Sequence, residues 1–296
     1  MLDDAAVFPP GLAPLPEAVA AHHGHETAWY GGLVGPLVIA ASALGELAEL
    51  QRAGGVDRSA GDSASGGSAA GGPLRLALTF PGGPARIAEA LEASAALPVS
   101  LEALEVAVPE GMAPDELLAA LDSVVPEAAV PEAAQPEVFV EIPRDARRDP
   151  LLAALAGTRY RAKFRTGGVR AELYPDEAEL AATVLAAVGA GVPFKATAGL
   201  HHALRNTDPE TGFEQHGFLN LLLATDAAAC GAEAETVRDL LAERDGAVVA
   251  ARIRELGEER TAAARARFTS FGTCSVTDPL TELAGLGLLA EPGGAA

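Results

Sequence analysis

The sequence predicts an α/β protein built as a TIM-like (β/α) barrel. Short strand-like runs alternate with Ala- and Leu-rich helical runs, which is typical of a parallel sheet with crossover helices. The 296 residues are enough to form one large α/β domain. A Gly-x-Gly-x-x-Gly turn, which would favour a doubly wound dinucleotide-binding sheet instead, follows none of the early strands.

Seven strands are recognisable, one fewer than a closed eight-stranded barrel requires. After a helix predicted at residues 15–21, they lie at residues 35–40, 74–80, 101–108, 137–142, 159–165, 192–198 and 268–276. Helices are predicted between them, for example at residues 84–95, 114–124 and 176–188. We expect the missing strand within the mostly helical stretch 220–266.

The alternation predicts a single barrel domain over residues 1–296, with an amino-terminal helical extension before the barrel. Residues 57–72 are rich in Ser, Gly and Ala, a composition typical of a flexible insertion. This insertion is not a domain boundary, because β/α units continue on both sides of it.

Composition excludes several classes of partner. The formal net charge of −20 argues against nucleic acid, because phosphate contacts need clustered Lys and Arg. The first residues lack a basic, apolar leader, and no stretch reaches the roughly 20 apolar residues of a membrane span. Two cysteines, Cys230 and Cys274, are too few for a disulfide framework. We therefore expect a cytoplasmic protein without a membrane or nucleic-acid partner, and leave a homo-oligomer open.

Strand side chains alternate between two faces, and the outer face of a barrel strand should be apolar where it meets helices. Applied to the four strands between residues 101 and 198, this rule predicts that the following side chains point inward: Glu105, Phe139, Glu141, Lys163, Arg165, Lys195 and Thr197. Isolated charges inside a barrel are very costly, so these groups should pair or line a wet site.

Lys163 and Lys195 are the only lysines of the chain. Unlike arginine, a buried lysine can lose its proton and act as a nucleophile or base. We therefore expect Lys195 to be catalytic, with its pKa lowered by the like charge of Lys163, and Glu105, Glu141 and His201 to shuttle protons. The alternative is a structural network of lysines and carboxylates that fills the barrel.

A substrate site is expected where the later strands end. Two consecutive glycines after Arg165 would let backbone N–H groups approach an anionic group that the arginine attracts. Two imidazoles follow the Lys195 strand, and a thiol lies near the end of the last strand. The predicted substrate-binding residues are Arg165, Gly167, Gly168, Thr197, His202 and Cys274.

Two short segments resemble class I aldolases of the deoxyribose-phosphate type. Residues 195–200, with the sequence KATAGL, resemble that family's Lys-x-[Ser/Thr]-x-Gly-[Phe/Leu] strand. Residues 163–170 end in Gly-Gly-Val-Arg and are similar to its second lysine strand, although the two strands occur here in reversed order. The resemblance implies a barrel in which Lys195 forms a Schiff base with a carbonyl substrate.

The sequence thus predicts a lyase or isomerase that acts on a small carbonyl or phosphorylated metabolite through an active-site lysine, without a cofactor. Two alternatives stay open. One is enolase-like proton abstraction with a divalent metal, for which Glu105 and Glu141 would supply oxygen ligands. The other is a non-catalytic ligand-binding barrel whose charges are structural.

Overall fold

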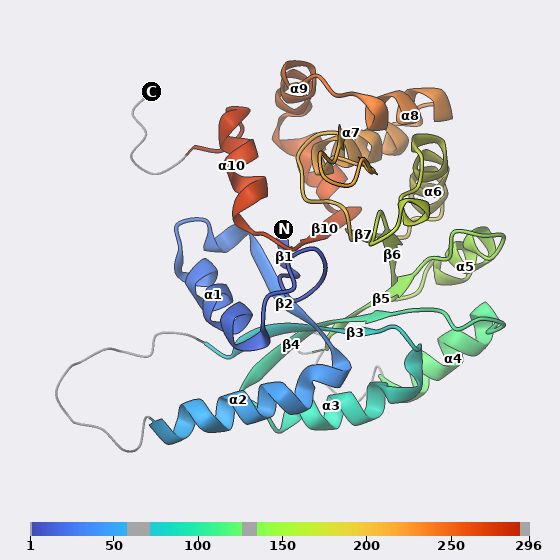
Figure 1. The fold of residues 1–296 in the computed structure, drawn as a ribbon. Helices are drawn as coiled ribbons and strands as arrows, with labels where there is room; N and C mark the ends of the chain where they lie inside the picture. Colours follow the sequence, from blue (N-terminus) through green and yellow to red (C-terminus); the bar gives the residue numbers. More distant parts are fainter. Residues whose placement is uncertain (1, 58–71, 126–134, 291–296) are drawn as a thin grey trace.

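The computed structural model describes residues 2–57, 72–125 and 135–290. At its centre, parallel strands form a closed barrel in the order β1-β10-β7-β6-β5-β4-β3-β2. Helices lie around the outside of this ring (Figure 1). The predicted TIM-like barrel is therefore confirmed.

The barrel strands are β1 (Leu2–Asp4), β2 (Val34–Ala40), β3 (Leu74–Phe80), β4 (Val99–Val106), β5 (Glu137–Glu141), β6 (Arg161–Arg165), β7 (Phe194–Thr197) and β10 (Phe268–Thr273). The α-helices are α1 (Leu15–Thr27), α2 (Leu44–Asp57), α3 (Ile87–Ala95), α4 (Pro114–Val124), α5 (Arg148–Leu155), α6 (Glu177–Gly189), α7 (Phe218–Ala229), α8 (Ala234–Ala242), α9 (Gly246–Arg265) and α10 (Thr277–Gly285). Short 3-10 turns lie at η1 (Gly31–Leu33), η2 (Ala41–Ala43), η3 (Pro84–Arg86) and η5 (Ala171–Leu173), and a small hairpin pairs β8 (Asn206–Thr207) with β9 (Glu214–Gln215).

The prediction of an eighth strand within residues 220–266 is wrong, because that stretch forms α7, α8 and α9. The eighth strand is β1, which pairs in parallel with β10 on one side and β2 on the other. It was not predicted because its three residues include two aspartates and show no alternation of apolar and polar side chains. As a result, α1 is the first crossover helix of the barrel rather than an extension that precedes it.

Two layers of side chains stabilise the barrel. The outer layer consists of fully buried apolar residues, such as Leu76, Leu104 and Phe194, packed between the strands and the surrounding helices. The inner layer is a smaller cluster of Val38, Ala77, Ala103 and Phe139. The inner residues are small apart from Phe139, which leaves room above them for the charged side chains of the same strands.

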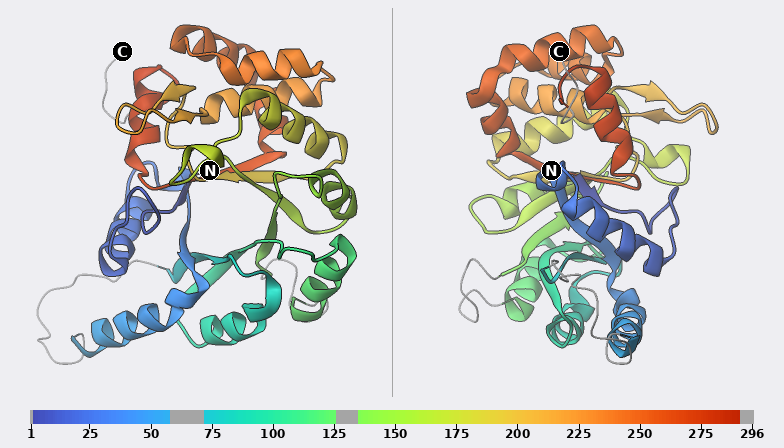
Figure 2. Two further views of the ribbon diagram at one scale, coloured as in Figure 1. Left: turned by 45° about the vertical axis from the view of Figure 1, so that its right-hand side comes forward. Right: turned by 90° about the vertical axis from the view of Figure 1, so that its left-hand side faces the viewer.

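The chain between β7 and β10 forms a helical group of its own. Helices α7, α8 and α9 lie together beside β7 and β10 (Figure 1, orange), and the β8–β9 hairpin projects from this group (Figure 2). In the described ranges, no helix combines the length and apolar character that crossing a membrane requires. The flexible insertion predicted at residues 57–72 falls, except for its two end residues, outside the described residues.

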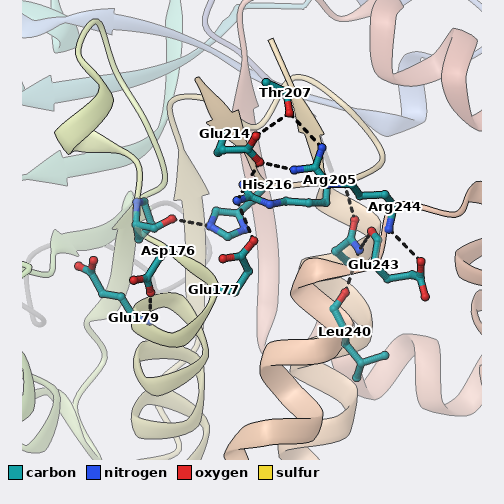
Figure 3. A network of polar contacts seen from close by, with 12 residues as sticks. Asp176, Glu177, Glu179, Arg205, Thr207, Glu214, His216, Leu240, Glu243 and Arg244 are labelled. Carbon is teal, nitrogen blue, oxygen red and sulfur yellow. Dashed lines mark hydrogen bonds and ion pairs between the residues drawn. The ribbon is translucent and has the colours of Figure 1, made fainter. Parts of the chain in front are cut away.

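A partly buried polar network ties the loop after β7 to the neighbouring helices (Figure 3). The guanidinium of Arg205 contacts the carboxylates of Glu177 at 2.7 Å and Glu214 at 3.2 Å. The Nε2 atom of fully buried His216 lies 2.8 Å from the carbonyl oxygen of Pro175. Because a carbonyl only accepts, this nitrogen carries the proton of the neutral ring. The network holds the start of α6 against the loop that leads into α7.

The buried imidazole of His216 predicts a pH-dependent stability. Burial lowers its pKa from 6.5 to about 4, against the opposing effect of the hydrogen bond to Pro175. Between these two values the unfolded chain binds a proton that the folded chain does not, so stability falls as the pH decreases. We expect a loss on the order of 3 kcal/mol between pH 7 and pH 4.

Urea unfolding at several pH values checks this expectation. The window from pH 6.5 to pH 4.5 is the informative one, because carboxylates with lowered pKa values lose their contribution only below it. His216→Gln should give a flatter profile than the unmodified protein. Equal slopes for the two proteins would show that His216 is not the group responsible.

Candidate active site

A cavity of about 300 Å³ opens at the carboxyl-terminal ends of the barrel strands. This end carries the active site in characterised TIM-barrel enzymes, and the volume suits a small molecule. Most of the predicted site residues converge here. Those that line the cavity are Glu105, Glu141, Lys163, Arg165, Gly168, Thr197, His201 and Cys274.

Charged side chains of alternating sign run from the barrel interior into this cavity. The amino group of Lys195 lies 2.6 Å from Asp3 and 2.6 Å from Glu105. The amino group of Lys163 lies 2.9 Å from Glu105 and 3.0 Å from Glu141. Arg165 completes the series by donating from Nε to Glu141 at 2.9 Å. We call this set the charged row, and its members in order are Asp3, Lys195, Glu105, Lys163, Glu141 and Arg165.

Strand register and side-chain alternation together produce the charged row. Glu141 is the Cα partner of Lys163 across β5 and β6, and Lys163 is the partner of Lys195 across β6 and β7. These side chains all point inward, as the alternation predicts, so neighbouring strands bring them together inside the barrel. Asp3 reaches the row from β1, where Ser270 of β10 donates a hydrogen bond to it at 2.7 Å.

Lys195 lies beneath the cavity. Its side chain is only 1% exposed, does not line the cavity, and places its amino group 5.1 Å from the ring centre of Phe139. Burial alone lowers the pKa of Lys195, but the charges and hydrogen bonds of Asp3 and Glu105 outweigh it and raise that pKa above its usual value. The predicted lowering by Lys163 is therefore wrong, because Glu105 lies between the two amino groups.

Lys163, in contrast, lines the cavity together with the two carboxylates that it pairs with. Burial raises the pKa of Glu105, yet the two lysines lower it overall to about 2. The pKa of Glu141 is also lowered, since Lys163 and Arg165 together outweigh its burial. Both carboxylates are therefore ionised at neutral pH, and Lys163 is the lysine that a bound ligand would meet.

Two predicted binding residues lie elsewhere. Gly167 packs against the neighbouring loop, because a Cβ there would sit 2.6 Å from Tyr174 and 3.0 Å from Gly199. Its missing side chain lets two loops approach, whereas Gly168, the other glycine of the predicted pair, lines the cavity. His202 turns toward α10, where its Nδ1 lies 2.6 Å from Glu282. That hydrogen bond raises the pKa of His202, so this imidazole serves a structural pair outside the cavity.

The backbone at the end of β7 is strained where it borders the cavity. Ala198 has a φ of 64°, in the left-handed region that non-glycine residues avoid, and Gly199 follows with a φ of 73°. The carbonyl of Ala198 accepts a hydrogen bond from the Thr166 hydroxyl at 2.6 Å. This turn directs the chain from Thr197 toward His201, and such strain is often found at functional sites.

Substitutions at Ala198 should change the free energy of unfolding in a way that reveals this strain. Because Ala198 lines the cavity, we expect the cost of a larger side chain to lie mainly in the backbone. We expect Ala198→Val to lower the free energy of unfolding by about 1–3 kcal/mol. Ala198→Gly should change it by less than about 1 kcal/mol. Urea unfolding measures both, and a Val variant as stable as the Gly variant would contradict the strain.

Sequence reasoning missed two features of the site. Asp3 was not recognised because residues 2–4 do not show a strand pattern, although Asp3 would have been placed inward had they been read as a strand. The second is a contact between Cys274 and His201, whose Sγ and Nδ1 atoms lie 3.3 Å apart. Nothing in the sequence signals this pair, because 73 residues separate its members.

The donor set of the cavity does not favour a metal. Within the part of the chain that the structure describes, no group of three or more His, Cys, Asp or Glu side chains is arranged to hold an ion. The predicted oxygen ligands, Glu105 and Glu141, instead direct their oxygens at Lys163, Lys195 and Arg165. Among the described residues, a third ligand beside them is therefore lacking.

Comparison of the chain with protein-family models finds no match, and no curated protein matches it significantly. The components of the site are two ionised carboxylates, an ammonium group and a guanidinium that share one wall of a small cavity, with a thiol and an imidazole elsewhere on its lining. Such groups can bind an anion, polarise a carbonyl group and move a proton.

Proposed function

We propose that this protein is an enzyme that removes or adds a proton beside the carbonyl group of a small anionic metabolite, as an isomerase or lyase. One observation carries the proposal. The amino group of Lys163 lies at the cavity between two carboxylates, 2.9 Å from Glu105 and 3.0 Å from Glu141. A cation and a base therefore lie side by side where a substrate can reach both.

In this mechanism, the ammonium group of Lys163 donates a hydrogen bond to the substrate carbonyl oxygen. It stabilises the negative charge that develops there when the adjacent carbon loses its proton. The carboxylate of Glu141 accepts that proton, and the electron pair of the broken C–H bond forms the enolate. If the carbon that lost its proton carries a hydroxyl group, transfer of that hydroxyl proton to the former carbonyl oxygen and return of the first proton to the former carbonyl carbon complete an isomerisation. If the next carbon carries a leaving group, the enolate electron pair expels it and completes a lyase reaction.

Other members of the charged row bind the substrate or hold the reacting side chains in position. Arg165 is 39% exposed, so its guanidinium can hold an anionic group of the substrate while its Nε orients Glu141. The backbone of Gly168 lines the cavity nearby and can approach the same anionic group. Lys195 is a positioning residue, because it fixes Glu105, and Glu105 in turn fixes Lys163.

The resemblance to class I aldolases implies a Schiff-base mechanism instead. It requires a neutral amine that attacks the carbonyl carbon. Both lysines instead lie in ion pairs with two carboxylates each. We therefore favour Lys163 acting as an ammonium group, with the carbonyl oxygen as its partner.

Hydrogen–deuterium exchange tests the proposal. A panel of small aldehydes, ketones and keto acids, with and without a phosphate group, is incubated with the protein in D₂O and followed by proton NMR. We expect protein-dependent loss of the signal next to the carbonyl for at least one anionic compound. Ligand binding without exchange for any compound would favour the non-catalytic barrel instead.

Borohydride treatment of the same mixtures separates the two lysine mechanisms. An ammonium group that only donates a hydrogen bond leaves no trapped adduct, so we expect the mass of the protein to be unchanged. A mass increase mapped to Lys163 or Lys195 in a mixture that shows exchange would replace our mechanism with the Schiff-base one.

A further inference from the structure

We propose that Cys274 is a second reactive group of the cavity, with His201 as its proton acceptor, and that it reversibly captures an aldehyde group of the ligand as a hemithioacetal. The Sγ atom of Cys274 lies 3.3 Å from Nδ1 of His201, and both residues line the cavity. The choice of an aldehyde rests on the carbonyl substrate proposed above. The pairing of thiol and imidazole does not depend on that choice.

Two neighbouring strands bring the pair together. Cys274 directly follows β10, and His201 lies in the loop that follows β7, which pairs with β10. The backbone N–H of Cys274 points at Nδ1 of His201 from 3.5 Å. Because an N–H group only donates, Nδ1 acts as the acceptor and the proton of the neutral ring is on Nε2. A lone pair is therefore available at the nitrogen that faces the thiol.

The surroundings keep both groups neutral at rest. Burial raises the pKa of the Cys274 thiol, partly opposed by hydrogen bonds from the backbone N–H groups of Gly11 and Cys274 itself. Burial also lowers the pKa of His201, and the charge of His202 adds to this effect while Asp278 and Asp208 oppose it. A thiol beside a neutral imidazole becomes a nucleophile when the imidazole takes its proton during attack.

The capture step needs no further reactant. The sulfur forms a bond to the carbonyl carbon as the electron pair of the C=O double bond moves to oxygen. The imidazole of His201 receives the thiol proton and passes it to that oxygen, which becomes a hydroxyl group. Reversal of the same step releases the aldehyde and restores the thiol, so the capture is reversible.

The pair and the charged row occupy different walls of one cavity. In the ring of strands, β7 separates β6, which carries Lys163, from β10, which precedes Cys274. A small molecule in the cavity can therefore face Lys163 with one group and Cys274 with another. This arrangement favours a ligand with an aldehyde group at Cys274 and a second carbonyl group at Lys163 over a simple monofunctional carbonyl compound.

Alkylation by iodoacetamide tests the thiol–imidazole pair without knowledge of the substrate. The reaction forms an S–C bond, releases iodide and transfers the thiol proton to His201, and peptide mass spectrometry gives the rate at each cysteine. His201→Asn keeps a hydrogen-bond acceptor but no base, so we expect alkylation of Cys274 to slow about tenfold or more. The exposed Cys230 provides an internal reference for reagent and folding.

The matched control is His202→Asn, which removes the adjacent imidazole that pairs with Glu282 rather than with the thiol. Alkylation of Cys274 should then stay within about twofold of the unmodified protein, well short of the effect of a lost base. Equal Cys274 rates in the unmodified protein and His201→Asn would overturn the role of His201. That result would leave the exchange chemistry at Lys163 untouched.

Carbon NMR with ¹³C-labelled glycolaldehyde tests the capture itself and does not depend on the folding of a histidine variant. We expect a hemithioacetal resonance with the unmodified protein and with Cys230→Ser, and its loss with Cys274→Ser. The absence of this resonance from the unmodified protein, or its persistence in Cys274→Ser, would overturn the inference. Exchange in D₂O, measured on the same variants with the panel of anionic carbonyl compounds, reports separately on the proposed function.

Discussion

Replacing Glu105 with glutamine is expected to lower the free energy of unfolding by about 3–5 kcal/mol. The carboxylate of Glu105 is 2% exposed and lies within 2.9 Å of both lysine amino groups. An amide of the same shape cannot compensate two buried positive charges, so the cost is mainly that of two incompletely paired ammonium groups. Urea unfolding monitored by circular dichroism measures the effect.

A matched control exists on the same strand. Glu102 of β4 pairs with Arg75 at 2.6 Å, but about a third of each side chain is exposed to solvent. Glu102→Gln removes the same charge and should cost only about 0–1 kcal/mol, because solvent screens the pair. Similar losses for the two variants would mean that the barrel interior is far better solvated than the burial of Glu105 implies.

Lowering the pH should reveal how much the same ion pairs contribute to stability. The folded pKa of Glu105 is about 2, below the usual 4.5, so its contribution is present above pH 4.5. That contribution decreases as the pH falls from 4.5 through 2, because the unfolded chain then takes up the proton first. Glu105→Gln lacks this group, so its stability should depend less on pH than that of the unmodified protein in this range.

Lys163→Met should lower the rate of the carbonyl-dependent exchange by a factor of about 10²–10⁴. Methionine fills a similar volume but cannot donate a hydrogen bond to the developing enolate oxygen, so the loss should appear in kcat. Steady-state exchange rates over a range of substrate concentrations would separate this effect from weaker binding. Circular dichroism confirms that the variant is folded before the comparison.

Arg161→Met provides the matched control for this prediction. Arg161 lies on β6 two residues before Lys163 and pairs with Glu137 at the end of the barrel away from the cavity. This variant should exchange at the rate of the unmodified protein. If Lys195→Met abolished exchange while Lys163→Met retained it, the buried lysine would be the reactive one and our assignment would be wrong.

Alternation along the strands was enough to predict which charged side chains face the barrel interior. In residues 137–142 and 159–165, apolar side chains at every second position leave Glu141, Lys163 and Arg165 for the other face. The same rule failed for β1, whose three residues include Asp3 and Asp4 and contain no apolar period. Its strand conformation comes from pairing with β10, which is distant in the sequence.

The residues that line the cavity were harder to predict than the side chains that face the barrel interior. Alternation gives the direction of a side chain but not the depth at which it ends, so it could not show that Lys195 lies beneath the cavity while Lys163 lines it. The pKa of Lys195 depends on Asp3, a residue outside every predicted strand. The contact between Cys274 and His201 arises from two loops whose paths depend on the closed ring.

The pairing of β1 with β10 also affects the order in which the chain can fold. During synthesis β1 is made before the other strands, yet its partner on one side appears only 267 residues later, where Ser270 meets Asp3. Until then, β1 and β7 each present an unpaired edge, which invites contact with other chains. Chains shortened before residue 268 should therefore aggregate rather than form a smaller barrel.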